Sequence, residues 1–501
     1  MSRPIQRVAV VGRDAAAWLS ALVLHTAFGR SGVAVEVIEL PSRLQPVDVY
    51  DALPTLSALH KLLGLDEDDI LKACRGLQSL GQRFSNWSGP APAFLHAYDR
   101  AGIAINNVDF IHYWVRARQQ GLNVQLEEFS IGAAAAKAGR RLVFSDATET
   151  FSNAGAGCHL DAQSYVSLIR DAALRQGVLR TTGEVQRVES RGETIDAVVL
   201  ADERRVEADF YVDASDDEAR LIALLPGGGQ ESWSAWFGCD RMLAATGKPL
   251  KPAPAFAQIT AFANGWVGLY PLGDRTAVRS VYSSAAGSDQ SVLRMTALLS
   301  GLALGDAAVS ELRPGARRRP WIGNCVAIGR AAAALEPLDA VELHLIQAGL
   351  THLMTFFPVD ADSPAEAVAY NGQMARQVDN IRDFQVAHYL LNQRRDEPFW
   401  DRVRGAEPPS SLAYKRDLFA ARGVMASFDD ETFDVADWIS IFVGHGLIPR
   451  AYDPLADGLP GPDHIRHFQR MLAFVADQVR DMPSMEAEAD LSAPVPQGAP
   501  F

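Results

Sequence analysis

The first 40 residues constrain the fold of this chain more than any other segment. Residues 7–12, RVAVVG, form a short valine-rich run typical of a strand buried in a parallel sheet. Residues 13–28 are predicted to form a helix, and residues 33–40, VAVEVIEL, a second buried strand with Glu39 near its end. A strand, a helix and a strand in this order predict a dinucleotide type of α/β domain.

The length and charge of the chain limit its class. It has 501 residues, 48% of them hydrophobic, which predicts two to three packed modules. The net charge is −14 and no long run of Lys or Arg occurs, so non-specific nucleic-acid binding is excluded. The short cluster Arg317–Arg319 is expected to be solvated surface.

Cysteine spacing and hydropathy predict the compartment. The four cysteines are far apart and form no CxxC pair, so we expect buried free thiols and no metal site. No run of about 18 uncharged apolar residues occurs, so no transmembrane helix is expected. The N-terminus runs directly into a strand without a signal-peptide pattern. These features predict a cytoplasmic protein.

The turn after the first strand departs from the dinucleotide pattern GxGxxG. That pattern uses its first glycine for the tight turn, its second for close approach of the pyrophosphate and its third for helix packing. The corresponding residues here are Gly12, Asp14 and Ala17. Asp14 brings a negative charge to the pyrophosphate position, while Glu39, 27 residues after Gly12, lies where a ribose-binding acid belongs. The turn alone leaves open whether any nucleotide binds.

Later motifs, spread over nearly the whole chain, resemble those of the flavin-dependent tryptophan halogenases. The matching strings are VAVVG with Trp18, Pro54-Thr55-Leu56 followed by KLLGLDEDDILKA, RFSNW ending at Trp87, HYWVRAR around Trp114, VDAS at 212–215, GWVGLYP at 265–271, VYSS at 281–284, WIGNCVAIG at 321–329, EPLD at 336–339, HLIQAGL at 344–350, RDF at 382–384 and GHGLIPRAYDPLAD at 444–457.

The resemblance implies an FAD-dependent aromatic-hydroxylase-like (GR2-type) fold. Its expected parts are a FAD-binding-type domain with an inserted substrate-pocket sheet over residues 1–355, a mainly helical region over 356–480 and a disordered tail over 481–501. In that family, FADH₂ from a separate reductase reacts with O₂ and halide. The hypohalous acid that forms reaches a lysine beside the aromatic substrate, and a glutamate assists. The implied cofactor contacts are Gly12, Asp14, Ala15, Ala17, Glu39, Val185, Gly329 and Leu338.

The catalytic positions of the family are changed in this chain. Ser79 stands at the lysine position and has no amine to hold an electrophilic halogen. Asp339 stands at the glutamate position with a shorter side chain. The family's W-x-W-x-I-P motif keeps only Trp266, since Gly268 replaces its second tryptophan. These changes indicate a lost function or, in the other reading, an altered chemistry.

The positions that contact ligands are changed as well. Val341 and Glu342 replace the Thr-Gly pair whose backbone amides hold halide in the family. Val47 and Val49 replace glycines of the flavin loop, and Asp216 replaces the glycine that closes the D-x-S-G pattern. Glycine is needed where a backbone must touch a ligand. We therefore expect FAD binding to be weak or absent.

Other candidate residues have structural interpretations. Asp161 is expected to cap a helix that we place over 159–176, and His344 to anchor a helix rather than to catalyse. Five aromatic residues could line an indole pocket or pack in the core: Phe94, Tyr98, Phe110, Tyr113 and Trp114.

Two functions remain open at this stage. The first is a non-halogenating paralogue with degenerate FAD, lysine and halide sites, which binds an aromatic ligand or a protein partner. The alternative is an active FADH₂- and O₂-dependent halogenase or monooxygenase acting on tryptophan or another aromatic, served by a flavin reductase. A homo-oligomer or a hetero-oligomer is compatible with either function.

Overall fold

The computed structural model describes residues 4–89, 92–360 and 365–486. Contacts divide the chain into two units. The first unit contains Met1–Cys74, Leu160–Ser234 and Leu312–Asp379, and the second contains Arg75–His159, Ala235–Glu311 and Asn380–Phe501. The domain boundaries expected above follow chain order and stay a prediction, and most of the tail over 481–501 lies outside the described residues.

The first unit is built on a six-stranded sheet with the order β20-β21-β12-β1-β2-β8. β1 pairs in parallel with β2 and with β12, while β12 pairs in parallel with β21. The two strands predicted at the start of the chain thus lie side by side in a parallel sheet, and β12 and β21 join them from distant parts of the sequence. The strands are β1 (Arg7–Gly12), β2 (Ala34–Glu39), β8 (Leu179–Thr182), β12 (Phe210–Ala214), β20 (Trp321–Ile322) and β21 (Cys325–Ala327).

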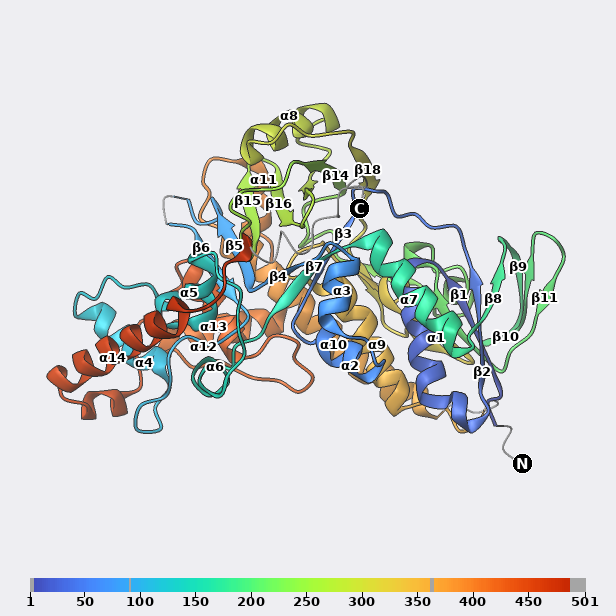
Figure 1. Cartoon of the computed structure of the whole chain (residues 1–501), viewed down its shortest axis with the longest axis horizontal. Helices are drawn as coiled ribbons and strands as arrows, with labels where there is room; N and C mark the ends of the chain where they lie inside the picture. The colour runs from blue at the N-terminus through green and yellow to red at the C-terminus, as the bar shows by residue number, and fades with distance from the viewer. Residues whose placement is uncertain (1–3, 90–91, 361–364, 487–501) are drawn as a thin grey trace, which may run out of the picture. The chain divides into compact units, whose positions relative to one another are not determined.

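Helices pack on this sheet, and its central strands β1 and β12 are buried on both faces. The helix α1 (Asp14–Phe28) contacts β1 and β2, and it packs beside α7 (Ala162–Gln176) and α9 (Val341–Thr355) (Figure 1). Gly12 ends β1 where a Cβ atom would lie 2.3 Å from the Ala214 carbonyl oxygen of β12. Only glycine permits this close approach of the two strands. The unit also contains β3 (Val49–Ala52), α2 (Leu56–Leu62), α3 (Glu67–Ala73), β13 (Gln230–Ser232), β19 (Gly315–Arg317) and β22 (Ala333–Ala334).

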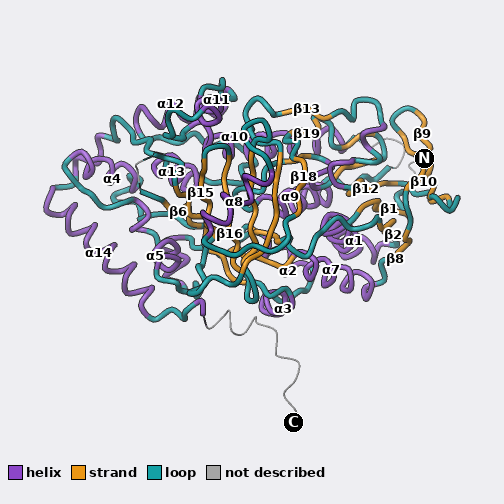
Figure 2. Tube along the Cα trace, turned by 90° about the horizontal axis from the view of Figure 1, so that it is seen from above, coloured by secondary structure: helices purple, strands orange, loops and turns teal. Residues whose placement is uncertain are grey.

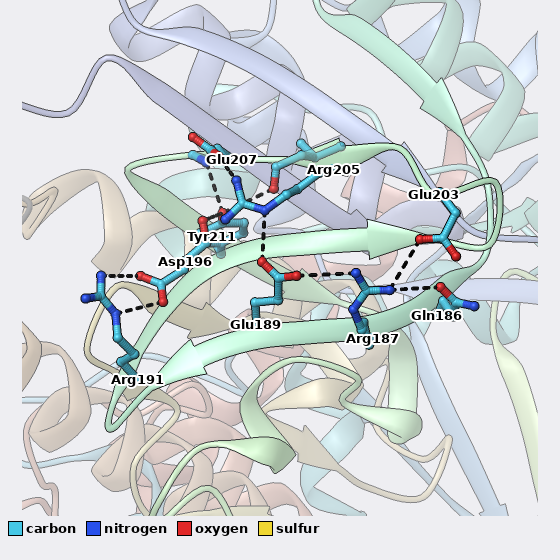
Figure 3. A network of polar contacts seen from close by, with 11 residues as sticks. Gln186, Arg187, Glu189, Arg191, Asp196, Glu203, Arg205, Glu207 and Tyr211 are labelled. Atoms are coloured by element: carbon cyan, nitrogen blue, oxygen red, sulfur yellow. Dashed lines mark hydrogen bonds and ion pairs between the residues drawn. The ribbon is translucent and has the colours of Figure 1, made fainter.

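A separate three-stranded ribbon covers one side of the first unit. Its strands are β9 (Val185–Arg191), β10 (Thr194–Leu200) and β11 (Arg205–Val206), in the order β11-β10-β9. The apolar side chains of Ile195, Val198 and Leu200 join those of Ala9 and Val11 in one core. The outer face carries a ladder of ion pairs, in which Arg205 pairs with Glu189 and Arg191 with Asp196 (Figure 3).

The second unit is built on a seven-stranded sheet with the order β18-β14-β17-β16-β15-β5-β6. All neighbours in it are antiparallel except the parallel pair β15 and β5. This sheet is mixed, with one parallel and five antiparallel pairs of neighbours. The strands are β5 (Gly81–Ser85), β6 (Phe94–Ala97), β14 (Arg241–Gly247), β15 (Ala257–Phe262), β16 (Gly265–Pro271), β17 (Thr276–Tyr282) and β18 (Ala308–Glu311).

Helices make up much of the rest of the second unit. Figure 2 shows α4, α5, α13 and the long α14 around the strand β6. The helices are α4 (Phe110–Gln119), α5 (Ile131–Lys137), α6 (Asp146–Ser152), α8 (Asp289–Ser300), α11 (Pro398–Arg404), α12 (Ser410–Arg422), α13 (Val435–Gly444) and α14 (Gly461–Arg480). The helix α10 (Glu366–Leu390) contributes residues to both units.

Two local expectations need correction. Residues 159–161 are not helical but end the strand β7 (Gly157–Asp161), because this strand pairs with β4 (Leu77–Ser79). The helix begins at Ala162, and Asp161 caps it as expected by accepting a hydrogen bond from the Ser164 amide at 2.8 Å. Arg317 is buried rather than solvated, and its Nε donates to the Ala331 carbonyl at 2.7 Å.

The four cysteines are buried thiols, as the sequence analysis expected. Cys74, Cys158, Cys239 and Cys325 are all buried and form no disulfide bond. Within the described ranges, no helix combines the length and the apolar character that crossing a membrane requires. The same ranges hold no group of three or more His, Cys, Asp or Glu side chains arranged to bind a metal ion.

Candidate functional site

The carboxyl ends of β1, β2 and β12 form the edge where a parallel nucleotide-type sheet binds its ligand. Asp14 lies here with φ of +54°, a backbone conformation that favours glycine. Its carboxylate accepts a hydrogen bond from the Ser42 hydroxyl at 2.5 Å and one from the Arg43 amide at 3.4 Å. Burial raises the pKa of Asp14, and these two hydrogen bonds act against that shift. Asp14 thus contacts the segment that follows β2.

Asp216 follows β12 and also has a positive φ, of +67°. Its carboxylate accepts a hydrogen bond at 2.6 Å from Nε of Arg330, which comes directly after Gly329. Burial lowers the pKa of Arg330, but the charges of Asp216, Glu342 and Asp217 outweigh it and the net shift is upward. A glycine position of the family therefore holds one half of an ion pair, and the other half comes from 114 residues further along the chain.

Arginines tie the remaining acids of this edge to one another. Arg13 donates to Glu218 at 3.2 Å, and Arg220 donates to the same carboxylate at 2.5 Å. Arg43 pairs with Glu218 as well and with Asp217 at 3.2 Å. We call this set the charged edge. It consists of Arg13, Asp14, Arg43, Asp216, Asp217, Glu218, Arg220 and Arg330.

The ribose position is also engaged with protein groups. Glu39 ends β2, as the sequence predicted. It accepts a hydrogen bond from the indole Nε1 of Trp18 at 3.1 Å and one from Nε of Arg180 at 2.7 Å. An incoming hydroxyl group would have to compete with both donors.

Glu342 and Tyr50 interact electrostatically with acids of the charged edge. Glu342 lies in the first turn of α9, after Asp339 and Ala340, both of which have positive φ, of +59° and +58°. Burial raises the pKa of the Tyr50 phenol well above its usual value, and the charges of Asp14, Glu342 and Asp216 raise it further. The charges of these three acids, which stand where the resemblance places glycines, therefore all act on one buried tyrosine.

The other implied cofactor contacts take ordinary structural places. Ala15, Ala17 and Leu338 are buried in the core. Val185 begins β9, pairs with Leu200 of β10 and packs against the core of the first unit. Val341 is buried at the start of α9, and Val49 is fully buried in β3.

The two catalytic positions fall in different units. Ser79 ends β4 in the second unit, where it is fully buried and its hydroxyl donates to the Gly81 carbonyl at 3.3 Å. Asp339 is buried in the first unit. Trp266, in the second unit, donates from Nε1 to the Tyr389 hydroxyl at 3.0 Å. A Cβ on Gly268 would lie 2.6 Å from the Tyr270 hydroxyl, so a second tryptophan does not fit there without a shift of that ring.

Sequence reasoning found two acids of the charged edge, Asp14 and Asp216, and missed Asp217, Glu218 and the arginines. Arg13 and Arg330 each follow a glycine directly, at Gly12 and Gly329. A cation directly after a glycine of a nucleotide-type motif was the available signal for these two arginines. Arg43 and Arg220 carried no signal, since only folding brings them to Glu218.

The family of the chain follows from comparison with known proteins. A family model described as tryptophan halogenase matches residues 7–461. The chain belongs to the tryptophan halogenase family. Tryptophan 7-halogenase RebH of Lentzea aerocolonigenes is 24% identical over 508 residues, which cover 92% of this chain and 93% of that protein.

Solved structures of family members share the fold. BrvH, a flavin-dependent halogenase from Brevundimonas sp. BAL3, is 31% identical with a TM-score of 0.91 and covers 98% of this chain and 99% of its own. Xcc4156, a flavin-dependent halogenase from Xanthomonas campestris, is 28% identical with a TM-score of 0.93. The match covers 99% of this chain and 100% of that protein. The family is flavin-dependent, so FAD is the cofactor that the resemblance implies.

Proposed function

We propose that this member of the family does not halogenate and acts by binding, with its flavin and halide positions closed by its own side chains. The ion pair between Asp216 and Arg330 carries the proposal. Asp216 keeps the positive φ of a glycine position, but its side chain binds a protein cation there. A site kept for a cofactor would leave this position open.

The charged edge does not fit the pyrophosphate of FAD. Five acids belong to this region with Glu342 included, against four arginines, and each arginine already forms an ion pair within the protein. Two unit charges 4 Å apart interact by about 4 kcal/mol at an effective dielectric of 20, before screening by the nearby arginines. A bound pyrophosphate would therefore have to separate existing pairs and approach Asp14 and Asp216.

The catalytic position supports the same proposal. The Ser79 side chain is a neutral hydroxyl, fully buried and hydrogen-bonded to its own segment. It offers neither an amine that could carry a halogen nor a cation that could polarise one. Asp14, Asp216 and Glu342 oppose the binding of flavin and halide, which precedes the step at position 79. Ser79→Lys alone should therefore not restore turnover.

The second candidate is an active FADH₂- and O₂-dependent halogenase or monooxygenase. It is favoured by the 31% identity to BrvH over 98% of this chain. In that case the arginines of the charged edge would turn to the cofactor and release their acids on binding.

Calorimetry with oxidised and reduced FAD separates the two candidates. We expect binding weaker than micromolar for the native protein. The variant Asp14→Gly, Asp216→Gly, Glu342→Gly, Arg330→Leu should bind at least about tenfold more tightly, a change of about 1.4 kcal/mol. Asp463→Gly, an exposed acid on α14, serves as the control and should change nothing. A sub-micromolar constant for the native protein would overturn the proposal.

Turnover gives a second measurement. The native protein, supplied with a flavin reductase, NADH, bromide and tryptophan, should form no brominated indole. Ser79→Lys should form none either. Product from the native protein would establish the active-enzyme candidate instead.

A further inference from the structure

The second unit contains a cavity of about 720 Å³, and none of the residues that the resemblance assigns to flavin, halide or catalysis lines it. It lies between β6, α4 and α13, and we call it the α13 cavity. Ligand pockets for small organic molecules span roughly 300–1,000 Å³. The α13 cavity therefore has room for a ring system with a side chain.

Its walls are largely apolar and partly aromatic. Phe94, Phe110 and Trp114 line it from β6 and α4, and Ile439 and Val443 line it from α13. A Cβ on Gly444 would lie 2.2 Å from the Phe94 ring, so glycine at this position lets the ring rest against α13. Of the five aromatic residues singled out in the sequence, Tyr98 and Tyr113 are instead packed in the core.

Acids outnumber bases among the lining residues, with four carboxylates and two guanidinium groups. Asp99 accepts hydrogen bonds from the Ser130 hydroxyl at 2.5 Å and the Gly132 amide at 2.8 Å. Asp434 accepts from the amides of Ala436 and Asp437 at the start of α13. Within the described part of the chain, neither acid has an ion pair with a basic side chain.

The cations of the lining are directed to other partners. Arg100 donates to the carbonyl groups of Phe151 and Thr150, at 3.2 and 2.7 Å. Arg118 donates to the Leu122 carbonyl and lies over the Trp114 ring at 5.4 Å. Burial raises the pKa of Asp99 to about 6, and the negative charge of Asp437 acts in the same direction. Asp434 is exposed at the start of α13.

We propose that the α13 cavity binds a small molecule that carries a protonated amine on an aromatic ring. The ring packs against the apolar walls, and the amine lies at Asp99 and Asp434. A cation there supplies the charge partner that both carboxylates lack in the protein. The proposal gives a ligand class to the binding role proposed above and rests on it.

His96 of β6 is not among the residues that line the cavity. Leu95 and Ala97 line it, whereas His96 between them points to Asp437, with Nε2 and Oδ1 at 2.9 Å. Alternate residues of a strand face opposite sides of the sheet. Changes at Leu95 and Ala97 can therefore be made without touching His96.

Three probes with one ring and different charges test the proposal by calorimetry at pH 7.5: 1-naphthylmethylamine, 1-naphthalenemethanol and 1-naphthoic acid. We expect the amine to bind about tenfold more tightly than the alcohol, and the acid to bind more weakly than both. No probe binding at all, or the acid binding as tightly as the amine, would overturn the proposal.

Variants locate the site. Asp434→Asn keeps a good helix cap but removes the charge, so it should weaken the amine by about three- to tenfold and leave the alcohol unchanged. Asp99→Asn should act in the same direction. Ser440→Phe, which fills the cavity from α13, should weaken amine and alcohol alike, and Asp463→Asn on α14 should weaken neither.

An unchanged amine affinity in both Ser440→Phe and Asp434→Asn would place binding elsewhere and refute the site. Flavin, halide and turnover do not enter this experiment. A negative result here therefore leaves the proposal for the charged edge standing, and FAD binding by the native protein leaves this one standing.

Discussion

The charged edge of the first unit and the α13 cavity of the second both contain carboxylates at a place that could hold a ligand. They differ in where the balancing charge comes from. Asp216, Asp217 and Glu218 each pair with an arginine of the protein. Asp99 and Asp434 accept only hydroxyl and amide hydrogen bonds in the described structure. The first site is neutralised from within, while the second leaves charge for a ligand to balance.

The comparison teaches that the backbone of a site and its chemistry can separate. Asp14, Asp216, Asp339 and Ala340 all keep the positive φ that glycine favours. The backbone therefore keeps conformations that suit glycine at positions where this chain carries side chains. A positive φ costs a residue with a side chain roughly 1–2 kcal/mol, and a local hydrogen bond of an Asp reduces that cost.

Breaking the ion pair of the charged edge should have the largest effect. Arg330→Leu leaves Asp216 without its cation in a half-buried place, and we expect the free energy of unfolding to fall by about 2 kcal/mol. Adding Asp216→Gly should recover most of this loss, because it removes the lone carboxylate and suits the positive φ. Urea denaturation of the native protein, both single variants and the double variant measures the coupling.

The exposed pair of Asp463 and Arg466 on α14 is the matched control for that cycle. Its coupling should stay below about 0.5 kcal/mol, since solvent screens it. If the double variant Asp216→Gly, Arg330→Leu is as unstable as the sum of its single changes, the two residues are not coupled and the charged edge is not held together as described.

A smaller effect is expected at Glu342, where the resemblance places halide. Glu342→Gly should raise bromide affinity by about tenfold, some 1.4 kcal/mol, because a like charge leaves the first turn of α9. Anomalous scattering at the bromine edge in soaked crystals would reveal the ion. Glu342→Gln, with its similar size and no charge, separates repulsion from filled space. Equal bromide density in native protein and Glu342→Gly would show that Glu342 does not exclude the ion.

The sequence predicted the sheet of the first unit well because each strand carries its own signal. Residues 7–12 and 33–40 are apolar and rich in valine, and β1 and β2 form within them. The start of α7 was placed three residues early because residues 159–161 join β7, and its pairing with β4 involves residues about 80 positions away. Local patterns do not report such pairings.

For each interaction of the site, the sequence pointed to the acid but not to its basic partner. Asp14, Asp216 and Glu342 stand out because they occupy glycine positions. Their effect depends on Arg330 and Arg43, and these arginines belong to other segments that reach the edge only after folding. The α13 cavity was harder to foresee, because Phe94, Phe110 and Trp114 would also suit a packed core. Their spacing in the sequence does not distinguish the wall of a cavity from a packed core.

The smallest expected effect is a difference of sign in pH dependence between the two units. Burial lowers the pKa of His344, in the first unit, to about 4, and it raises that of Asp99, in the second, to about 6. The unfolded chain binds more protons than the native one at His344 between pH 6.5 and 4, so this residue's contribution to stability is lost as the pH falls through that range. Asp99 behaves in the opposite way, since its contribution is complete below about pH 4 and is lost as the pH rises to 6.

The two residues can be compared through the stability difference between native protein and variant. Asparagine keeps a polar group at both positions but does not titrate. As the pH is lowered from 6.5 to 4, the free energy of unfolding of the native protein minus that of the variant should shrink for His344→Asn. The same difference should grow for Asp99→Asn. Urea midpoints at half-unit pH intervals measure both slopes. Slopes of the same sign would mean that one of these groups is not desolvated as its surroundings indicate. If the stability difference for Asp99→Asn also shrinks as the pH is lowered, Asp99 is not the buried charge on which amine binding in the α13 cavity depends.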